Sequence, residues 1–232
     1  RIPGFLRYYQ WFLKRQHKIS PRKLYRCIVG KGYDVEIAFN RGAAARIIAA
    51  STSKTAKKIV WVHNDYMRCG NATAGFLTTE EAVAAYGRYH HIVCVSKQSE
   101  VAFEERFGRF SSLTSLSNIL DFSEIQNKAD SNLVTNQGQM LCAVGRLAEQ
   151  KNYPMLLDAA AILKNKGVEF NLWIVGGGAD MDALKAQKER LGLDNVTLWG
   201  AQENPYPYLA AADGYVCSSI YEGLSTTTIE AL

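Results

Sequence analysis

Two carboxylates stand eight positions apart at the end of the sequence, which closes with SSIYEGLSTTTIEAL. Between Glu222 and Glu230 lie a glycine, Gly223, and a run of hydroxyl side chains, Ser225–Thr228, that is typical of the start of a helix. A helix start presents free backbone N–H groups and the positive end of the helix dipole, and a glycine lets a ligand approach the backbone closely. The stretch therefore predicts a binding site.

The two carboxylates limit what this site can bind. An acid on each side of the turn repels an anion, so we expect the glutamates to serve a neutral, hydroxylated group. Ionised carboxylates accept strong hydrogen bonds, and sugar hydroxyls are the obvious donors. For either glutamate taken alone, an exposed acid at a helix start is the simpler interpretation.

A second junction, VGRLAEQKN (144–152), carries two cations five residues apart. Arg146 and Lys151 lie between an apolar stretch that ends at Gly145 and a helix that Asn152 is placed to cap. Because an arginine clamps phosphate oxygens with its planar fork and a lysine adds a mobile point charge, the pair suits a diphosphate. Two solvated surface cations are the alternative interpretation.

A triple glycine follows a third apolar stretch in VGGGAD (175–180). The spacing G-x-G-x-x-G of a dinucleotide-binding loop is absent. Such a loop is also followed, about twenty residues downstream, by an acid at the end of a strand, whereas Asp194 follows a helix. We therefore interpret this segment as a tight turn that lines a cleft, and not as a cofactor loop.

Short apolar stretches alternate with helical patterns, which indicates parallel sheets covered by helices. Thr78 and Glu81 form a capping box for a helix over 78–89, and Ser96 is placed to cap the next helix. The expected strands are 33–39, 57–64, 91–96, 112–119, 140–145, 170–176, 195–200 and 214–219. The expected helices of the second half are 152–166, 180–191, 205–211 and the residues from 226 onwards.

A polar stretch, 121–138, interrupts the alternation and is our candidate linker. It gives a first domain over residues 1–135, including the crossover, and a second domain over 136–232. The expected fold class is α/β, with two Rossmann-like, doubly wound parallel-sheet domains and a cleft between them. In such sheets ligands bind at the carboxyl ends of the strands.

The first 33 residues carry nine basic side chains, no acid and many aromatic ones, whereas the other residues carry 18 basic and 22 acidic side chains. One interpretation is a peripheral contact with an anionic membrane surface. The other is a helix that packs its aromatic side inward and solvates its charges. Basic charge alone also suits nucleic acid, but no recognition motif supports that partner, so none is expected.

Five cysteines are scattered without a close pair, and Cys94, Cys142 and Cys217 lie in apolar stretches. This pattern predicts buried, reduced thiols in a cytoplasmic protein. The sequence has no acidic cluster with metal-ligand spacing and no apolar run of the ~18 residues that a membrane-spanning helix needs. We therefore expect no metal, no cofactor and no spanning helix.

Several short motifs follow one another along the chain. The second half holds G-R-L…K-N (145–152), V-G-G-G (175–178), W-G…Y-L-A-A-A-D (199–213) and E-G-L-S-T-T-T-I-E-A (222–231), and the first half holds WVHND (61–65), VCVS (93–96) and SNILD (117–121). Together they resemble the retaining glycosyltransferases of family 4, GT-B enzymes whose active site lies between two Rossmann-like domains. The spacing of the two glutamates matches that family's E-x7-E pattern. The likeness is nearest to bacterial enzymes that build capsular and other surface polysaccharides.

The resemblance implies roles for individual residues. Arg146 and Lys151 would neutralise the diphosphate of a nucleotide-sugar donor, and Glu222 would hold hydroxyls of the transferred sugar. His63 would reach the sugar from the first domain, with Asp65 and Ser96 as weaker candidates. The remaining donor-binding residues would be Glu230, on the ribose, and Gly145, Gly223, Leu224, Ser225 and Thr226, with backbone amides over 223–226 on the sugar and phosphate.

The resemblance also implies a reaction. A hexosyl-type group would move with retained configuration, without a metal, from a nucleotide-sugar donor to a glycan or lipid-linked acceptor at the inner membrane face, in surface polysaccharide synthesis. UDP is the expected nucleotide. Another nucleotide-sugar or glycan enzyme, such as an epimerase or a phosphorylase, stays open, as does a basic membrane module that binds polysaccharide precursors without turnover.

The sequence departs from the family pattern in two ways. Ser225 stands where many members carry proline, which does not threaten the chemistry. The family's first strand and glycine-rich loop are not visible before Arg1, and its closing helices are not visible after Leu232. We therefore expect a fragment with both domains incomplete, and such a fragment can lack activity.

Overall fold

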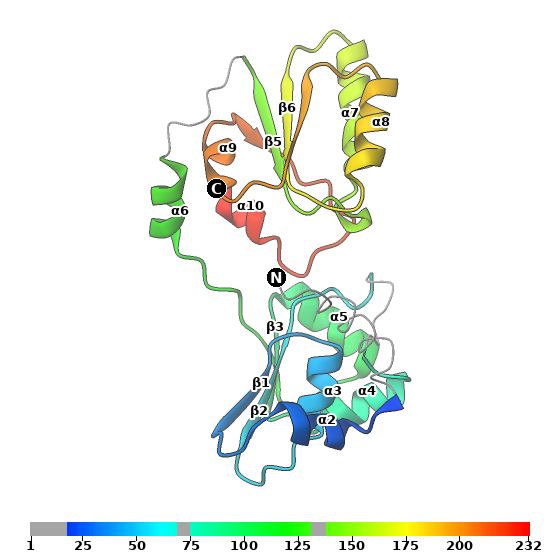
Figure 1. Ribbon diagram of the computed structural model, residues 1–232, viewed down its shortest axis with the longest axis vertical. Helices are drawn as coiled ribbons and strands as arrows, with labels where there is room; N and C mark the ends of the chain where they lie inside the picture. The colour runs from blue at the N-terminus through cyan, green and yellow to red at the C-terminus, as the bar shows by residue number, and fades with distance from the viewer. Residues whose placement is uncertain (1–17, 69–74, 131–137) are drawn as a thin grey trace. The chain divides into compact units, whose positions relative to one another are not determined.

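The computed structural model of the chain describes residues 18–68, 75–130 and 138–232 (Figure 1). The chain divides into two compact units, of which the first ends at Asn118 and the second begins at Ile119. Each unit contains a four-stranded, fully parallel sheet, ordered β1-β2-β3-β4 in the first and β7-β6-β5-β8 in the second. The alternation in the sequence therefore predicted the fold class correctly.

In the first unit the described elements alternate as the sequence suggested. Its strands are β1 (Val35–Ala38), β2 (Lys57–Val62), β3 (His91–Cys94) and β4 (Leu113–Ser115), each inside a predicted stretch. Its helices are α2 (Pro21–Ile28), α3 (Ala43–Ala49), α4 (Thr79–Tyr86) and α5 (Lys97–Phe107). Figure 1 shows these helices in one layer against one face of the sheet.

Two predicted caps explain where α4 and α5 begin. Thr78 Oγ1 accepts a hydrogen bond from the amide of Glu81 at 3.2 Å, and Ser96 Oγ accepts one from the amide of Ser99 at 3.1 Å. The capping box is not fully reciprocal, because the Glu81 carboxylate accepts from the amide of Leu77 at 2.7 Å. Its other oxygen pairs with the buried Arg46 at 3.1 Å and so ties α4 to α3.

Aromatic side chains build the core between these helices. The rings of Tyr66, Tyr86, Phe103 and Phe107 meet at centroid distances of 4.9 to 5.6 Å, and the two tyrosine hydroxyls are 2.7 Å apart. On β1 the alternate side chains Val35 and Ile37 are exposed. Within the described residues, the helices of this unit thus cover one face of its sheet.

The second unit is richer in elements. Its strands are β5 (Met140–Val144), β6 (Asn171–Val175), β7 (Val196–Gly200) and β8 (Gly214–Tyr215). Its helices are α6 (Phe122–Ala129), the 3-10 turn η2 (Glu149–Lys151), α7 (Tyr153–Asn165), α8 (Met181–Arg190), α9 (Tyr206–Ala210) and α10 (Thr226–Glu230). β8 ends at Tyr215 and is therefore shorter than the predicted strand over 214–219; beyond it, the Ser218 hydroxyl donates to the carbonyl of Lys151 at 2.6 Å.

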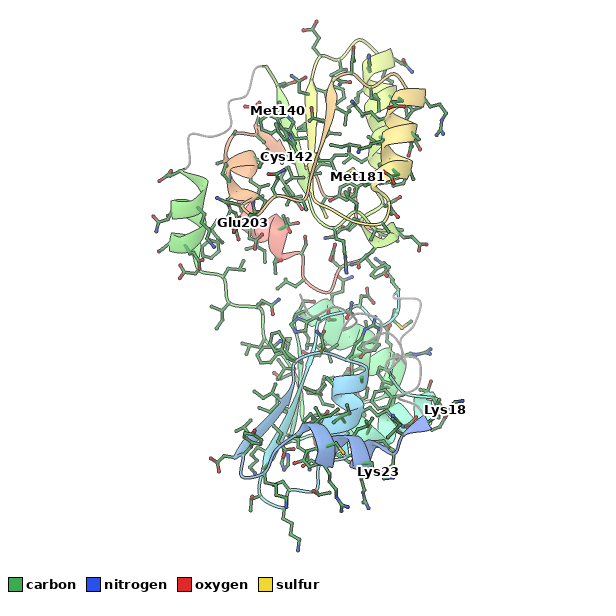
Figure 2. The ribbon with its side chains drawn as sticks, in the orientation of Figure 1. Lys18, Lys23, Met140, Cys142, Met181 and Glu203 are labelled. Carbon is green, nitrogen blue, oxygen red and sulfur yellow. The ribbon has the colours of Figure 1, made fainter. Side chains whose placement is uncertain are left out.

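Helices cover both faces of the second sheet, as a doubly wound sheet requires. Leu157 of α7 and Leu184 of α8 are buried with Ile174 in the cluster on one face. Tyr208 of α9 packs with Trp173 on the other face, in a cluster that also holds Met140 and Cys142 of β5, labelled in Figure 2. The alternate residues of β5 and β6 thus enter opposite cores.

The polar stretch over 121–138 contains a folded helix. Asp121 caps α6 by accepting the amide of Glu124 at 3.0 Å, and the side chain of Asn204, just before α9, donates to the carbonyl of Lys128 at 2.8 Å. α6 also packs against α9. The division between the units therefore precedes α6, whereas the sequence suggested a boundary after residue 135.

Candidate active site

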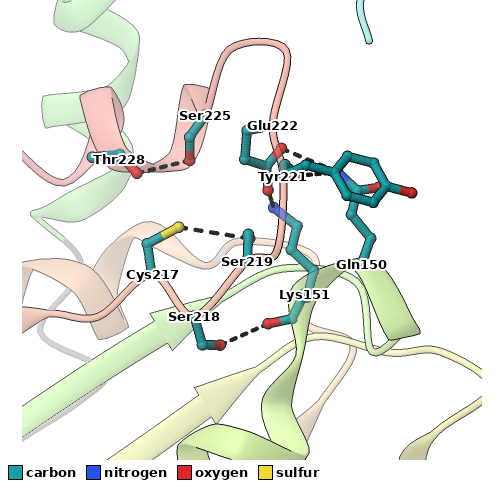
Figure 3. Close-up of polar contacts among 9 residues, drawn as sticks. All are labelled: Gln150, Lys151, Cys217, Ser218, Ser219, Tyr221, Glu222, Ser225 and Thr228. Atoms are coloured by element: carbon teal, nitrogen blue, oxygen red, sulfur yellow. Dashed lines mark hydrogen bonds and ion pairs between the residues drawn. The ribbon is translucent and has the colours of Figure 1, made fainter. Parts of the chain in front are cut away.

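Two loops meet at the carboxyl ends of β5 and β8 in the second unit (Figure 3). The loop after β5 contains Gln150 and Lys151, and the loop after β8 contains the stretch from Ser218 to Glu222. The amide of Ile220 donates to the carbonyl of Gln150 at 2.9 Å, and the Ser218 hydroxyl donates to that of Lys151. These contacts fix the two loops to each other, although about 70 residues separate them in the chain.

Lys151 and Glu222 form an ion pair across these loops. Lys151 Nζ lies 2.7 Å from Glu222 Oε1, and the side chains are 18% and 22% exposed. The other carboxylate oxygen, Oε2, accepts from Gln150 Nε2 at 3.3 Å. The sequence assigned Lys151 to a phosphate and Glu222 to a sugar, and the structure places the two side chains in direct contact.

Gly145 brings the stem of Lys151 close to the end of β5. A Cβ atom at Gly145 would lie 2.9 Å from the Tyr153 hydroxyl and 3.2 Å from Lys151 Cε, so only glycine fits without displacing them. Tyr153, the first residue of α7, is itself buried. The strand end, the lysine and the start of α7 are therefore packed together.

Arg146 lies exposed beside a hollow of about 210 Å³. The hollow runs along the carboxyl ends of β5, β6 and β7, and Gly145, Gly176 and Gln202 are among the residues that line it. Larger hollows of about 710 Å³ and 520 Å³ lie at the amino ends of the two sheets. Parallel sheets bind ligands at the carboxyl ends, so the smaller hollow is the one that suits a binding site.

The triple glycine over 176–178 packs backbone against the loop of Arg146. A Cβ atom at Gly178 would lie 2.0 Å from the Leu147 carbonyl oxygen, and one at Gly176 would lie 1.8 Å from the Gly145 carbonyl oxygen. The amide of Leu147 donates to the carbonyl of Gly177 at 3.0 Å. The predicted turn is thus a packing device that supports the Arg146 loop.

We expect Gly178→Ala to lower the free energy of unfolding by about 1–3 kcal/mol, because the new methyl group must displace the backbone at Leu147. Urea unfolding measures this change. Gly87→Ala is the matched control, since Gly87 has a φ of −62° and its Cβ would meet nothing closer than 3.4 Å. Equal unfolding free energies for the two variants would contradict the packing role.

The hydroxyl run after Glu222 starts α10, as predicted, but its amides are partly engaged. Ser225 precedes the helix, and its Oγ accepts from the Thr228 hydroxyl at 2.7 Å. The amide of Thr226 donates to the carbonyl of Leu224 at 3.0 Å and would have to change partner to meet a phosphate. Gly223, Leu224, Ser225 and Thr226 are all half-buried, and their donor-binding role stays a prediction.

Glu230 ends α10 and meets a residue that the sequence did not single out. Burial raises the pKa of its carboxyl above the usual value, and a hydrogen bond with the Tyr206 hydroxyl lowers it in part. Tyr206 opens α9. The structure thus gives Glu230 a fixed partner within the second unit, and its role on a ribose stays a prediction.

His63 follows β2 in the first unit, at the carboxyl end of the sheet. Its ring packs against the Phe39 ring in a tilted arrangement, at a centroid distance of 4.8 Å, and bonds to the backbone of Phe39. Within the described chain, Nε2 is buried without a hydrogen-bond partner, so we infer that Nδ1 donates and that Nε2 is left as an acceptor. Burial lowers the pKa of His63 below 6.5.

This lowered pKa predicts a pH-dependent stability. The unfolded chain protonates its histidine near pH 6.5, before the folded chain does, so the contribution of His63 is present above that pH and is lost as the pH falls below it. We expect His63→Gln to lose less stability than the parent protein between about pH 7 and about pH 5. Urea unfolding over that range measures this difference, and equal losses would contradict the assignment.

The weaker candidates have local structural roles. Asp65 is buried, and its Oδ1 accepts from the amide of Met67 at 2.9 Å. Ser96 caps α5. These contacts account for both residues without a ligand.

The cysteine expectation is correct in part. Cys94 and Cys142 are buried, and burial raises the pKa of each thiol to about 12. Cys217 is exposed and was wrongly expected inside, because β8 ends at Tyr215 and Cys217 lies in the loop that follows it. Cys27 is also exposed, whereas Cys69 lies outside the described residues.

The basic start of the chain is described from Lys18 onwards, so the predicted membrane contact lies largely outside the described residues. In α2, Leu24 and Tyr25 are buried, while Lys23, labelled in Figure 2, is exposed. No helix in the described ranges is long and apolar enough to cross a bilayer. Over the same ranges, no group of three or more His, Cys, Asp or Glu side chains is placed to hold a metal ion.

Comparison with known proteins gives the class of this fold. Residues 124–232, nearly the whole second unit, match the family described as Glycosyl transferases group 1. The structure resembles that of a mutant form of S. aureus TarM in complex with Fondaparinux, alpha-GlcNAc-glycerol and UDP, with a TM-score of 0.71 and 18% identity over 91% of this chain and 42% of that one. The two parallel α/β units and this likeness show that the chain has the GT-B fold.

Two further proteins extend the comparison. Anabaena HepE in complex with UDP and glucose gives a TM-score of 0.68 with 21% identity, over 86% of this chain and 56% of that one. The N-acetylgalactosamine-N,N'-diacetylbacillosaminyl-diphospho-undecaprenol 4-alpha-N-acetylgalactosaminyltransferase of Campylobacter jejuni is 35% identical over 118 residues. That match covers 50% of this chain, and the chain spans 31% of the length of the Campylobacter protein.

Two residues of the site were not predicted from the sequence. Gln150 and Tyr206 each contact one of the predicted glutamates. Both are common polar types with no distinctive spacing, so only their contacts reveal them. The local sequence around Gln150 gives no sign that its side chain contacts Glu222, which lies 72 residues further along the chain.

Proposed function

We propose that the protein is a glycosyltransferase that takes a sugar from a nucleoside-diphosphate sugar at the carboxyl edge of the second sheet. The contact between Lys151 and Glu222, within the region that matches Glycosyl transferases group 1, carries this proposal. It brings a phosphate-binding cation and a hydroxyl-binding carboxylate to one place. Arg146, exposed on the same loop, adds the second cation.

The proposed chemistry uses this charge arrangement directly. In the transition state positive charge builds on the sugar while negative charge builds on the departing diphosphate. Fixed cations aimed at the leaving group lower this barrier. Lys151 would exchange Glu222 for the diphosphate when the donor binds, and the carboxylate would then accept hydrogen bonds from the sugar hydroxyls.

The finer terms of the proposal are a hexosyl-type sugar, retained configuration, a UDP-linked donor, no metal, and a glycan or lipid-linked acceptor in surface polysaccharide synthesis. TarM and HepE have been solved with UDP, which supports the nucleotide. The Campylobacter protein is named for transfer to a diphospho-undecaprenol-linked sugar, which supports a lipid-linked acceptor. Such an acceptor fits a cytoplasmic protein whose basic residues 1–33 contact the inner membrane face.

A donor screen tests this proposal. Incubation with radiolabelled UDP-glucose, UDP-galactose, UDP-N-acetylglucosamine, UDP-N-acetylgalactosamine and GDP-mannose, together with a membrane lipid extract, should move label from one donor to a lipid or glycan acceptor. Transfer that continues after EDTA treatment would support the metal-free mechanism, and restoration by Mg²⁺ would contradict it. Epimerised donor without transfer would contradict the transferase assignment.

A further inference from the structure

The strongest unassigned feature of the site is Gln150, whose side-chain amide reaches both of its neighbours in the facing loop. Gln150 Nε2 donates to the carbonyl of Tyr221 at 2.9 Å and to Glu222 Oε2 at 3.3 Å. An amide nitrogen carries two hydrogens, so both are used. We propose that Gln150 is a positioning residue that holds Glu222 for the donor sugar; this inference rests on the proposed function.

The backbone supports this role of the side chain. The amide of Ile220 donates to the carbonyl of Gln150 at 2.9 Å, so the loop that carries Glu222 is fixed to Gln150 at residues 220, 221 and 222. Figure 3 shows the Gln150 side chain extended along this loop, with Lys151 on the other side of the carboxylate. The Glu222 carboxylate is therefore held at both oxygens.

Lys151 and Gln150, the two partners of Glu222, respond differently when a nucleotide-sugar donor binds. A diphosphate attracts Lys151 strongly, because the ammonium is a mobile point charge on a flexible stem. Gln150 is neutral, so a diphosphate attracts it far less than it attracts Lys151. When Lys151 turns to the donor, Gln150 keeps the carboxylate in place.

A neutral amide also suits the proposed use of Glu222. It directs Oε2 without neutralising the carboxylate, so the ionised group retains its strength as an acceptor for sugar hydroxyls. A cation at this position would compete with the sugar for that charge. The inferred role is thus specific to the sugar half of the donor and separate from the diphosphate half.

Binding measurements on Gln150→Met test the inference. The methionine fills a similar volume but donates no hydrogen bond. By calorimetry, we expect the Kd of the UDP-sugar bound by the parent protein to rise about five- to tenfold, and the Kd of UDP to change less than about twofold. The matched control is Gln187→Met, because Gln187 Nε2 bridges the carbonyl of Pro154 at 3.0 Å and the carboxylate of Asp158 at 2.8 Å, outside this site.

The possible binding results separate the positioning role of Gln150 from the proposed function. If Gln150→Met binds UDP-glucose, UDP-N-acetylglucosamine or UDP-N-acetylgalactosamine as tightly as the parent protein does, the positioning role is wrong while the proposed function stands. An equal loss for UDP and the UDP-sugar would show a merely structural role and would also overturn it. A parent protein that binds neither UDP nor any of the five nucleotide sugars of the donor screen overturns the proposed function itself. If Gln150→Met does not fold, Gln150→Asn, which shortens the side chain by one methylene, replaces it with the same criteria.

Discussion

Arg146→Ala is expected to lower kcat for sugar transfer about a hundredfold or more, a loss of about 3 kcal/mol of transition-state stabilisation. Arg146 is exposed beside the hollow at the carboxyl ends of β5, β6 and β7, where a diphosphate would lie. Removing the guanidinium takes away one donor from the charge that grows on the leaving group. Initial rates at saturating donor measure the effect.

Two further variants test whether the loss of kcat is specific to the guanidinium of Arg146. Arg146→Lys keeps the charge but loses the planar fork, so we expect an intermediate loss of kcat. Arg190→Ala removes an exposed cation at the end of α8 and should leave kcat unchanged. A kcat for Arg146→Ala within about threefold of that of Arg190→Ala would show that Arg146 is an ordinary surface cation.

Glu222→Gln should also reduce transfer about a hundredfold, because a neutral amide accepts hydrogen bonds from sugar hydroxyls more weakly than an ionised carboxylate does. The same change frees Lys151 Nζ from its partner at 2.7 Å. UDP, which lacks the transferred sugar, should therefore bind at least as tightly as it does to the parent protein. Initial rates and calorimetry give the two quantities.

This opposition between turnover and UDP affinity is the test of the exchange mechanism. Glu189→Gln, at an exposed position of α8, is the control for the lost charge. A Glu222→Gln variant that transfers sugar at the rate of Glu189→Gln would remove the glutamate from the chemistry. Weaker UDP binding would contradict competition between Glu222 and the diphosphate for Lys151.

The sequence predicted the elements well where the local signals were strong. The cap at Thr78 and the apolar stretches of β5 and β6 lie where they were expected, because capping and alternation depend on neighbouring residues. The end of β8 was missed. The strand ends at Tyr215, and the residues after it include Ser218, which bonds to the Lys151 carbonyl across 67 residues, a contact that no local pattern encodes.

In the candidate site, too, local features were predictable from the sequence and long-range contacts were not. Residue types and spacing singled out Lys151 and Glu222 as candidates, but their pairing across 71 residues depends on how two loops pack. Gln150 could not be predicted, since a single neutral amide between two charged residues is typical of any surface turn. The triple glycine was predicted as a turn, and the reason for it, contact with the backbone of Gly145 and Leu147, came from the structure.

Amide hydrogen exchange with and without a UDP-sugar tests the central claim most directly, because it locates the donor without relying on turnover. A donor held between the loops after β5 and β8 should slow exchange over residues 144–152 and 218–230 of the second unit. The hollow of about 520 Å³ at the amino end of the same sheet, lined by Lys164 and Asn195, serves as the internal reference. Slower exchange at both site loops, with no change around the reference hollow, is the predicted result; protection confined to the reference hollow would contradict the account.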